Sequence, residues 1–488
     1  MMGTGVFDNN GLEWLQTLVI AYNKFLMYYL GVMLFLAGLL VIVGWISVNH
    51  YVRMRPLRDY RHVGTSELSM PVSILVPGFN EELNIVESVR SLLATQFSQM
   101  EVIVINDGST DKTLQVLQDA FKLVAVERAP RSGLATMPVR HVYASPVDPR
   151  IVVVDKENGG KADALNAGIN YAQYPLVSAI DADTMLDPGA LARLVWEFQS
   201  HSDTVATGGI VRIANGSTVK DGRLVSIATP HRQFLANVQI VEYLRAFLGG
   251  RLGWSRMGML LIISGAFGLF RRDVLVNAGG YNGDTITEDA ELVLRIRKYQ
   301  ADHKLPCRIT FFPDPICWTE APTTVKSLVR QRDRWQRGLG ETLIRHRSML
   351  FRKKYGRIGW VALPYFWAFE FLEPLITVTG MIVTTLALMF GFGSMPVYLL
   401  MLTFAFAYGF FISMAIILLE ERAFRRYPNW RDLRRMTVTA FLENFGFRQW
   451  QAFVRMRAIF RIRSERKQWG EQKRVGFTRA QHVEELPA

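Results

Sequence analysis

The stretch that decides the fold begins at residue 72 with VSILVPGFNEE and continues at residue 102 with VIVINDGSTD. In both places a short apolar, β-branched segment runs into a polar turn and then into residues with helical spacing. Val72–Val76 precedes the helical pattern Glu81–Thr95 in this way, and Val102–Ile105 precedes Asp111–Phe121. Such alternation is typical of a mostly parallel sheet that is covered by helices. The stretch therefore predicts an α/β domain.

The same alternation extends from about residue 70 to about residue 315. Further strands are expected at Ile151–Val154, Val177–Ile180 and Ile309–Phe312, and a further helix at Lys161–Ala172. Sheets of this kind bind their ligands outside the carboxyl ends of the strands. Because the unusual polar residues of the chain follow these strand ends, we expect the functional site there.

An apolar segment before this domain, Phe25–Val48, carries no charge and is long enough to cross a bilayer. Arginines follow it from Arg53 onward. By the positive-inside rule they place the N-terminus outside and the α/β domain in the cytosol. The preceding segment, Gly11–Asn23, contains Glu13 and is expected to form an interfacial helix.

A second apolar region, Ile358–Phe392, follows the domain, but two prolines and two glutamates interrupt its first part. This pattern predicts an interfacial or kinked segment and then a crossing at Leu375–Phe390. Pro396–Leu419 predicts a third crossing, after which the basic tail lies in the cytosol. The expected units are residues 1–52 (interfacial segment and first crossing), 53–320 (cytoplasmic domain), 321–357 (interfacial helices), 358–420 (interfacial segment and two crossings) and 421–488 (basic cytoplasmic segment).

The composition agrees with a membrane protein. Half of the 488 residues are hydrophobic, 20% are charged, and the net charge is +13. Lys and Arg gather beside the apolar segments, as at residues 352–354, which indicates cytoplasmic loops and argues against nucleic-acid binding. The two cysteines, Cys307 and Cys317, give neither a disulfide framework nor zinc spacing. We expect two small buried side chains in reducing surroundings.

Charged residues stand at successive strand ends. Helix capping explains most of the polar residues in NDGSTD, but it does not explain Asp107. Lys161 opens a helix after the glycines of KENGGK, which opposes the helix dipole unless an anion such as a phosphate is present. Asp181 and Asp183 are carboxylates one residue apart, a pair that favours a divalent cation. Each feature alone is a weak signal, but together they predict a site for a metal and a phosphate-bearing ligand.

Two further motifs follow, TED at residues 287–289 and QRDRW at residues 331–335. Acidic residues at a helix start are also what the helix dipole favours, and a basic helix beside the membrane would by default contact lipid headgroups. In this order, with Asp107 and the DAD of residues 181–183, the motifs resemble those of membrane-integrated family 2 glycosyltransferases. That group includes cellulose, hyaluronan, chitin and poly-N-acetylglucosamine synthases. The resemblance covers about residues 70–338.

The resemblance implies a GT-A-like, Rossmann-like fold and an inverting transfer from a nucleotide-diphosphate sugar. It implies Asp289 as the general base, with Glu288 beside it in the catalytic motif. It implies a Mg²⁺ or Mn²⁺ ion on Asp181 and Asp183. The implied donor-binding residues are Phe79, Glu81, Asp107, Lys161, Asp183, Gln331 and Arg334, and the implied acceptor residues are Ser264, Gly265 and Trp335.

Departures from the family pattern leave alternatives open. The acceptor-loop cysteine typical of cellulose synthases is absent, and three crossings are fewer than in well-known polymer-secreting members. The expected product is a β-linked extracellular polysaccharide made from UDP-glucose or UDP-N-acetylglucosamine. The alternatives are a transferase that adds one or few sugars to a lipid or lipid-linked acceptor, and a non-catalytic membrane scaffold. The expected location is the inner or plasma membrane, and a partner subunit or oligomer could complete an export path.

Overall fold

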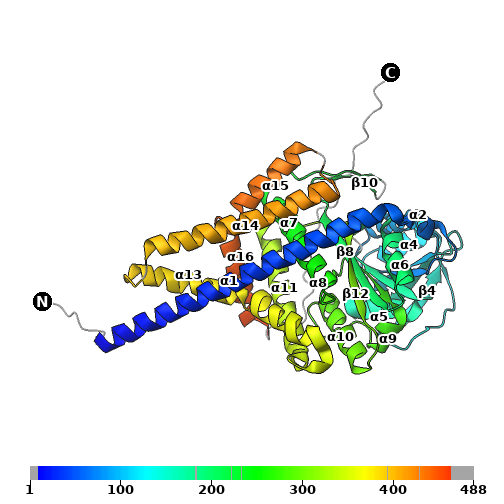
Figure 1. The fold of residues 1–488 in the computed structure, drawn as a ribbon. Coiled ribbons are helices and arrows are strands. Elements are labelled where there is room, and N and C mark those ends of the chain that lie inside the picture. The colour runs from blue at the N-terminus through cyan, green and yellow to red at the C-terminus, as the bar shows by residue number, and fades with distance from the viewer. Residues whose placement is uncertain are drawn as a thin grey trace, which may run out of the picture.

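The computed structural model describes residues 9–181, 184–220, 223–231, 233–392, 394–427 and 429–462. Its centre is a ten-stranded sheet (Figure 1). All strands except β4, β11 and β7 run in the same direction. In spatial order the strands are β3 (Val124–Ala125), β4 (Val139–Ala144), β5 (Ile151–Lys156), β2 (Met100–Asp107), β1 (Val72–Gly78), β6 (Leu176–Ile180), β11 (Phe267–Arg271), β8 (Thr204–Ile213), β12 (Arg308–Thr319) and β7 (Met185–Leu186).

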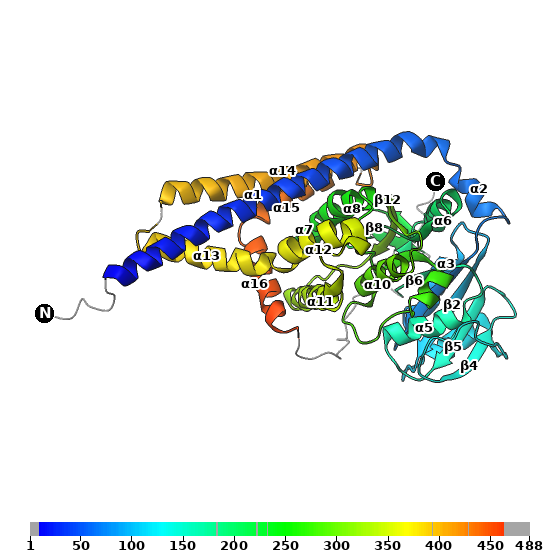
Figure 2. The same ribbon diagram turned by 60° about the horizontal axis from the view of Figure 1, so that its bottom comes forward.

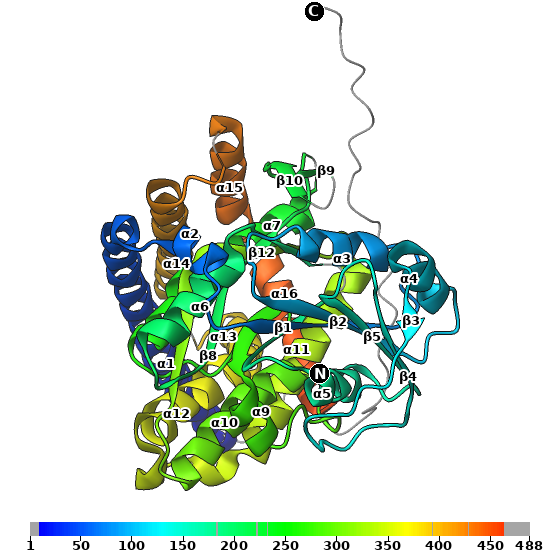
Figure 3. The ribbon, with the colours of Figure 1, turned by 90° about the vertical axis from the view of Figure 1, so that its right-hand side faces the viewer.

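Helices cover both faces of the sheet, and this is why its central strands read as continuous apolar runs. Every residue of β2 and of β8 is buried. Helices α3 (Ile85–Leu93) and α4 (Thr113–Phe121) lie on one face of the parallel strands and α5 (Lys161–Tyr171) lies on the other (Figure 3). The predicted fold class, an α/β, GT-A-like domain with a mostly parallel sheet, is confirmed.

Three long helices extend together away from the sheet: α1 (Asn9–Met54), α13 (Glu373–Met389) and α14 (Met395–Ala423) (Figures 1 and 2). By length and apolarity, the helix at Glu13–Leu57 and the helix at Met395–Ala423 can each cross a membrane. Ile358–Phe371 and Glu373–Met389, bent by 43° at their junction, make a third crossing if the two count as one span. The three crossings expected from the sequence are thus the upper limit within the described residues, and their orientation stays a prediction.

Helix α1 also corrects one expectation. Gly11–Asn23 is not a separate interfacial helix, because α1 runs without a break from Asn9 to Met54. No helix-breaking residue separates the two parts, and polar side chains of the first part bind α13 instead. Tyr22 lies 2.5 Å from the Thr379 hydroxyl, and Thr384 donates a hydrogen bond to Asn23 at 3.1 Å. Cross-helix contacts therefore give the early segment a reason to continue the helix.

Shorter elements join the sheet to the long helices. Helix α16 (Phe447–Phe460) packs against both α11 (Val325–Arg345) and α13. Its Arg455 forms an ion pair with Glu373 at 3.0 Å and donates a hydrogen bond to Gln336 at 2.9 Å. These elements are α2 (Tyr60–Thr65), α6 (Ala190–Ser200), α7 (Phe234–Leu244), the π-helix η2 (Arg245–Arg251), α8 (Leu252–Arg256), α9 (Arg272–Asn277), α10 (Glu288–Asp302), α11 (Val325–Arg345), α12 (Leu363–Tyr365), α15 (Trp430–Leu442), α16 (Phe447–Phe460) and the separate strand pair β9 (Thr218–Lys220) and β10 (Arg223–Ser226).

Candidate active site

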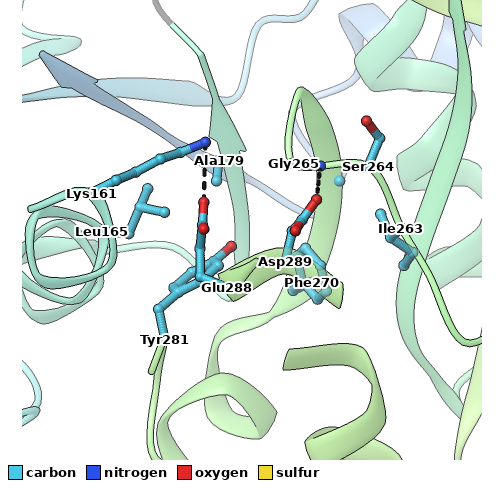
Figure 4. Close-up of a pocket in the computed structure, with 11 residues that line it drawn as sticks. Lys161, Leu165, Ala179, Ile263, Ser264, Gly265, Phe270, Tyr281, Glu288 and Asp289 are labelled. Carbon is cyan, nitrogen blue, oxygen red and sulfur yellow. Dashed lines mark hydrogen bonds and ion pairs between the residues drawn. The ribbon is translucent and has the colours of Figure 1, made fainter. Parts of the chain in front are cut away.

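A pocket lies where α5, the sheet and the start of α10 meet (Figure 4). Its walls come from segments that are far apart in the sequence, which adjacent strands and the helices packed on them bring together. The lining residues are Lys161 and Leu165 of α5, Ala179 of β6, Ile263, Ser264 and Gly265 of the loop before β11, Gly268 and Phe270 of β11, Tyr281, and Glu288 and Asp289 of α10.

Asp289 is held in a fixed orientation inside this pocket. Its Oδ2 accepts a hydrogen bond from the Gly265 backbone amide at 2.7 Å, and its Oδ1 accepts one from the Ala290 amide at 2.9 Å. Burial, and then the charge of Glu288, raise the pKa of Asp289, while Lys161 and the two amides oppose the rise. A carboxylate with a raised pKa and a fixed direction is suited to accept a proton.

Gly265 has to be small for this arrangement. A Cβ atom at this position would lie 3.0 Å from Asp289 Oδ2 and 3.3 Å from Asp289 Cβ. A larger residue would therefore push the Asp289 side chain away from the backbone amide that orients it. Ser264 precedes Gly265 in the same loop and also lines the pocket. The structure thus brings the predicted residues Ser264, Gly265, Glu288 and Asp289 together.

Lys161 lies on the other side of the pocket, between two acidic groups. Its Nζ is 2.6 Å from Asp181 Oδ1 and 3.3 Å from Glu288 Oε1. Burial by itself lowers the pKa of Lys161, but the charges of Asp181 and Glu288 outweigh burial and raise it. Lys161 is therefore a fixed cation at the start of α5, as expected for a residue that meets an anionic ligand.

The carboxylates around Lys161 bear on the expected metal. Asp181, the predicted ligand within the described residues, has the hard carboxylate oxygens that Mg²⁺ and Mn²⁺ prefer, and here it pairs with the ammonium group of Lys161. In ligand type Asp181 therefore fits a divalent ion. Asp183 lies outside the described residues, and among those described no three acidic, histidine or cysteine side chains form a ready metal site.

Asp107 stands at the end of β2 and orders the loop that leads into α5. Its Oδ1 accepts hydrogen bonds from Lys156 at 2.7 Å and from the Gly159 amide at 3.0 Å, and its Oδ2 accepts one from the Gly160 amide at 2.8 Å. Lys156 is fully buried. In this structure Asp107 therefore shapes the glycine loop that presents Lys161, a function that its position at a strand tip did not reveal.

Phe79 and Glu81 follow β1, next to this loop. Gly78 at the end of β1 pairs with Asn106 at the end of β2, so the two polar turns are neighbours. The turns are tied by Asn80, whose side chain accepts a hydrogen bond from the Thr110 amide at 2.8 Å. Phe79 is 43% exposed, which leaves its ring available to a ligand. None of Phe79, Glu81 and Asp107 lines the pocket in Figure 4.

The QRDRW residues lie on α11 and do not line this pocket either. Gln331 and Arg332 are buried, and Arg332 pairs with Glu242 at 2.7 Å while its guanidinium lies 4.6 Å from the centre of the Trp335 ring. Arg334 is exposed, and Trp335 is half-buried. The motif therefore divides into a buried, anchoring part and an accessible part.

Helix α11 also holds the TED motif in place. A Cβ atom on Gly338 would overlap the Thr287 side chain, so the two segments are in direct contact. One turn later, Glu341 accepts a hydrogen bond from the Ile286 amide at 3.1 Å. The two motifs of the sequence therefore meet in space, and α11 fixes where α10 begins.

Some residues near the site were not singled out from the sequence. Tyr281 is buried against the pocket, and its amide donates to Asn166 Oδ1 at 2.6 Å. Tyr243 of α7 lies near Trp335. Arg251 of η2 interacts with the charge of Asp289. The signal for Arg251 was present but slight, since it is a single cation in the otherwise apolar, glycine-rich run FLGGRLGW.

The part of the chain that contains this pocket is similar to known proteins. The family described as "Glycosyl transferase family 2" matches residues 73–137, and the family described as "Glycosyltransferase like family 2" matches residues 135–338. The poly-beta-1,6-N-acetyl-D-glucosamine synthase of Staphylococcus epidermidis is 30% identical over 275 residues, which is 56% of this chain and 56% of that protein. The synthase of the same name from Staphylococcus aureus strain COL is 29% identical over the same length.

The chain thus matches little more than half the length of these curated relatives. Among solved structures, a mannosyltransferase from Pyrobaculum calidifontis in complex with GDP-Man and Mn²⁺ is 17% identical, with a TM-score of 0.48 over 85% of this chain and 99% of that one. The two family matches together run from residue 73 to residue 338 and contain the whole pocket. This chain therefore belongs to the family 2 glycosyltransferases.

Proposed function

We propose that this protein is an inverting polysaccharide synthase that uses UDP-N-acetylglucosamine to build a β-linked polymer. The observation that carries the proposal is Asp289, a carboxylate with a raised pKa that two backbone amides aim into a pocket opposite a lysine. The relatives named as poly-beta-1,6-N-acetyl-D-glucosamine synthases support the choice of sugar. They support UDP-N-acetylglucosamine over UDP-glucose, the other donor that the sequence left open.

In this proposal Asp289 acts as the general base. It takes the proton from a hydroxyl group of the acceptor while that oxygen attacks the anomeric carbon of the donor sugar. The bond from the anomeric carbon to the diphosphate breaks in the same displacement, and the nucleoside diphosphate leaves with the electron pair. The anomeric centre is inverted. Gly265 orients the base through its amide. Burial, and then the charge of Glu288 at the adjacent position of α10, keep the pKa of Asp289 raised.

The donor would lie on the Lys161 side of the pocket. We propose that Phe79 and Glu81 contact the nucleoside, that Asp107 supports it through the loop it orders, and that Lys161 meets the diphosphate charge. Arg334, which is accessible on α11, and Gln331 would also bind the donor. Asp181 and Asp183 would hold Mg²⁺ or Mn²⁺, which when bound supplies Lewis-acid stabilisation of the leaving diphosphate.

The acceptor would lie on the opposite side of Asp289. We propose that Ser264 and Gly265 border its last sugar and that Trp335 supplies a flat apolar face for it. We further propose that α1, α13 and α14 anchor the protein in the inner or plasma membrane, with the pocket in the cytosol. A partner subunit or oligomer would complete an export path, because the described residues contain at most three crossings.

The test is nucleotide release from purified full-length protein in detergent or nanodiscs. UDP-N-acetylglucosamine, UDP-glucose and GDP-mannose are each supplied with Mg²⁺ or Mn²⁺. We expect release of UDP from UDP-N-acetylglucosamine only with a divalent ion, and a polymer that a β-N-acetylglucosaminidase digests. The Asp289→Asn variant is the control. Release from UDP-glucose alone would overturn the choice of donor, and release from none of the three would overturn the proposal.

Product length separates the proposed synthase from the alternative. Mass spectrometry of the product in the same reaction is expected to show chains of many sugars. One or two sugars on a lipid acceptor would instead identify a non-processive transferase, the reading that a small number of crossings favours.

A further inference from the structure

Arg251 is a charged residue in an apolar setting that the proposed reaction does not yet use. It ends the π-helix η2, and its guanidinium lies 4.4 Å from the centre of the Phe247 ring. Its Nη1 is buried and has no hydrogen-bond partner in the described part of the chain. Within the described residues no carboxylate lies within ion-pair distance of it. A buried guanidinium nitrogen without a hydrogen-bond partner is costly, so its retention calls for a ligand.

The charges around Arg251 indicate which side of the site it serves. Burial lowers the pKa of Arg251 to about 10, and the two groups that oppose this are Asp289 and Tyr243. Lys161, by contrast, interacts with Asp181, Glu288 and Asp289. Both cations therefore interact with the charge of Asp289. The two acidic partners of Lys161, Asp181 and Glu288, are not among the charges that act on Arg251.

Aromatic rings join Arg251 to the QRDRW motif. The Phe247 ring centre lies 5.6 Å from that of Tyr243, and Tyr243 lies 6.4 Å from Trp335. Burial raises the pKa of the Tyr243 hydroxyl, and the guanidinium groups of Arg332, Arg251 and Arg334 act against the rise. Among the described residues this hydroxyl has no hydrogen-bond partner. Trp335, Tyr243, Phe247 and Arg251 thus form a row of side chains with flat apolar faces. Two donors of this row, Arg251 Nη1 and the Tyr243 hydroxyl, are not used by any described residue.

We infer that Arg251, with the Tyr243 hydroxyl beside it, binds the acceptor sugar whose hydroxyl Asp289 deprotonates. The inference rests on the proposed function and extends it. A sugar has apolar faces and a rim of hydroxyl oxygens, so it can stack along Trp335 and Tyr243 while its oxygens accept hydrogen bonds from Arg251. The guanidinium fork would hold the attacking oxygen at a fixed distance from Asp289. Arg251 is therefore assigned to acceptor binding, apart from the donor residues.

The experiment compares acceptor and donor kinetics in full-length protein. Release of UDP from UDP-N-acetylglucosamine is measured without acceptor and with a short β-1,6-linked N-acetylglucosamine oligosaccharide. Arg251→Gln is expected to raise the KM for the oligosaccharide by roughly tenfold or more, the value of a hydrogen bond from a charged group, with the donor KM changed less than about twofold. Arg251→Lys and Tyr243→Phe should show smaller increases of the same kind. Arg256→Gln, an exposed arginine on the next helix, is the matched control and should behave as wild type.

The possible outcomes separate the two proposals. An unchanged acceptor KM in Arg251→Gln, or an equal rise in donor and acceptor KM, overturns the assignment of Arg251. If Arg251→Gln does not fold, Arg251→Lys and Tyr243→Phe decide: a selective rise in acceptor KM supports the assignment, and wild-type acceptor KM in both overturns it. Failure of the wild-type protein to release UDP counts against the proposed function itself, and is seen before any variant is made.

Discussion

Asp107 and Asp289 are both aspartates that sequence patterns place at the tip of an element, yet the structure treats them differently. Asp107 accepts three hydrogen bonds, one of them from the fully buried Lys156. Among the described residues Asp289 accepts two, both from backbone amides, and has Glu288 next to it. Both oxygens of Asp107 are thus engaged by a lysine and by backbone amides, whereas those of Asp289 are oriented by backbone amides alone.

The difference teaches how one residue type is divided between architecture and chemistry. A buried carboxylate that accepts hydrogen bonds from a lysine and from two backbone amides is locked in place. A carboxylate that burial and a like charge destabilise has a raised pKa, and it gains stability when it takes up a proton. The first arrangement builds a loop, and the second prepares a base.

The largest effect is expected from Asp289→Asn. The amide keeps the shape of the side chain but cannot take a proton, so turnover should fall about 10²–10⁴-fold with donor affinity nearly unchanged. UDP release and donor binding are measured on the same preparation. If the variant keeps a tenth of wild-type turnover, Asp289 is not the base.

The stability of that variant sharpens the comparison. A carboxyl group whose pKa is raised by folding binds its proton more tightly in the native state, so its stabilising contribution is lost as pH rises through the folded pKa. The neutral amide is free of this loss. Its nitrogen, however, cannot accept one of the two backbone hydrogen bonds. We therefore expect the Tm of Asp289→Asn, relative to that of wild type, to be higher at pH 7.5 than at pH 5. A deficit in Tm of the same size at both pH values would show that Asp289 is architectural as well.

Gly338→Ala should disturb Asp289 from a distance. A methyl group on Gly338 would overlap Thr287 and displace the start of α10, at a cost of about 1–3 kcal/mol for overpacking. We expect turnover to fall roughly tenfold while the protein still inserts in the membrane. Gly283→Ala is the control, because a Cβ there meets nothing within 4 Å. Equal activity of the two variants would contradict the contact between the motifs.

Asp107→Asn tests the architectural half of the comparison. The amide nitrogen of the asparagine is a donor, and it would stand where a carboxylate oxygen now accepts a hydrogen bond. One of the present donors would therefore lose its acceptor, while Lys156 keeps Asp163 at 2.6 Å as a second partner. The free energy of unfolding should fall by about 1–3 kcal/mol, the cost of leaving a buried donor unsatisfied. Thermal unfolding in detergent measures this loss. An unchanged Tm together with a large rise in donor KM would mean that Asp107 contacts the donor directly.

The smallest effect concerns pH. Because burial and Glu288 raise the pKa of Asp289, the base becomes protonated at a higher pH than an ordinary aspartate, whose pKa is about 3.9. The rate should therefore fall on the acid side at a pH clearly above 4, and stay constant above that limb until other groups titrate. A profile of turnover at saturating donor checks this. A rate that holds down to pH 4 would remove the support for a destabilised base.

Much of the sheet could be predicted from the sequence, because its parallel strands are short apolar runs with turn residues at each end. The five expected strands correspond to β1, β2, β5, β6 and β12. Strands β3, β4, β7, β8 and β11 were not predicted, although β8 is an interior strand of the sheet and fully buried. β8 contains the glycines of ATGGIV, which weaken a strand signal. They are needed there: a Cβ on Gly208 would press against Ile263 and Phe311.

The sequence by itself determined the order of the motifs, the apolar helices and the residue types of the site. These depend on local spacing, which is visible along the chain. Only the tertiary structure decided the partners: Gly265 for Asp289, Glu288 for Lys161, and Thr287 for Gly338. It also decided that Asp107 serves a loop and that Arg251 lies near Asp289. The physical reason is that strand pairing and helix packing, which join distant segments, set hydrogen bonding and burial, and these determine what each carboxylate can do.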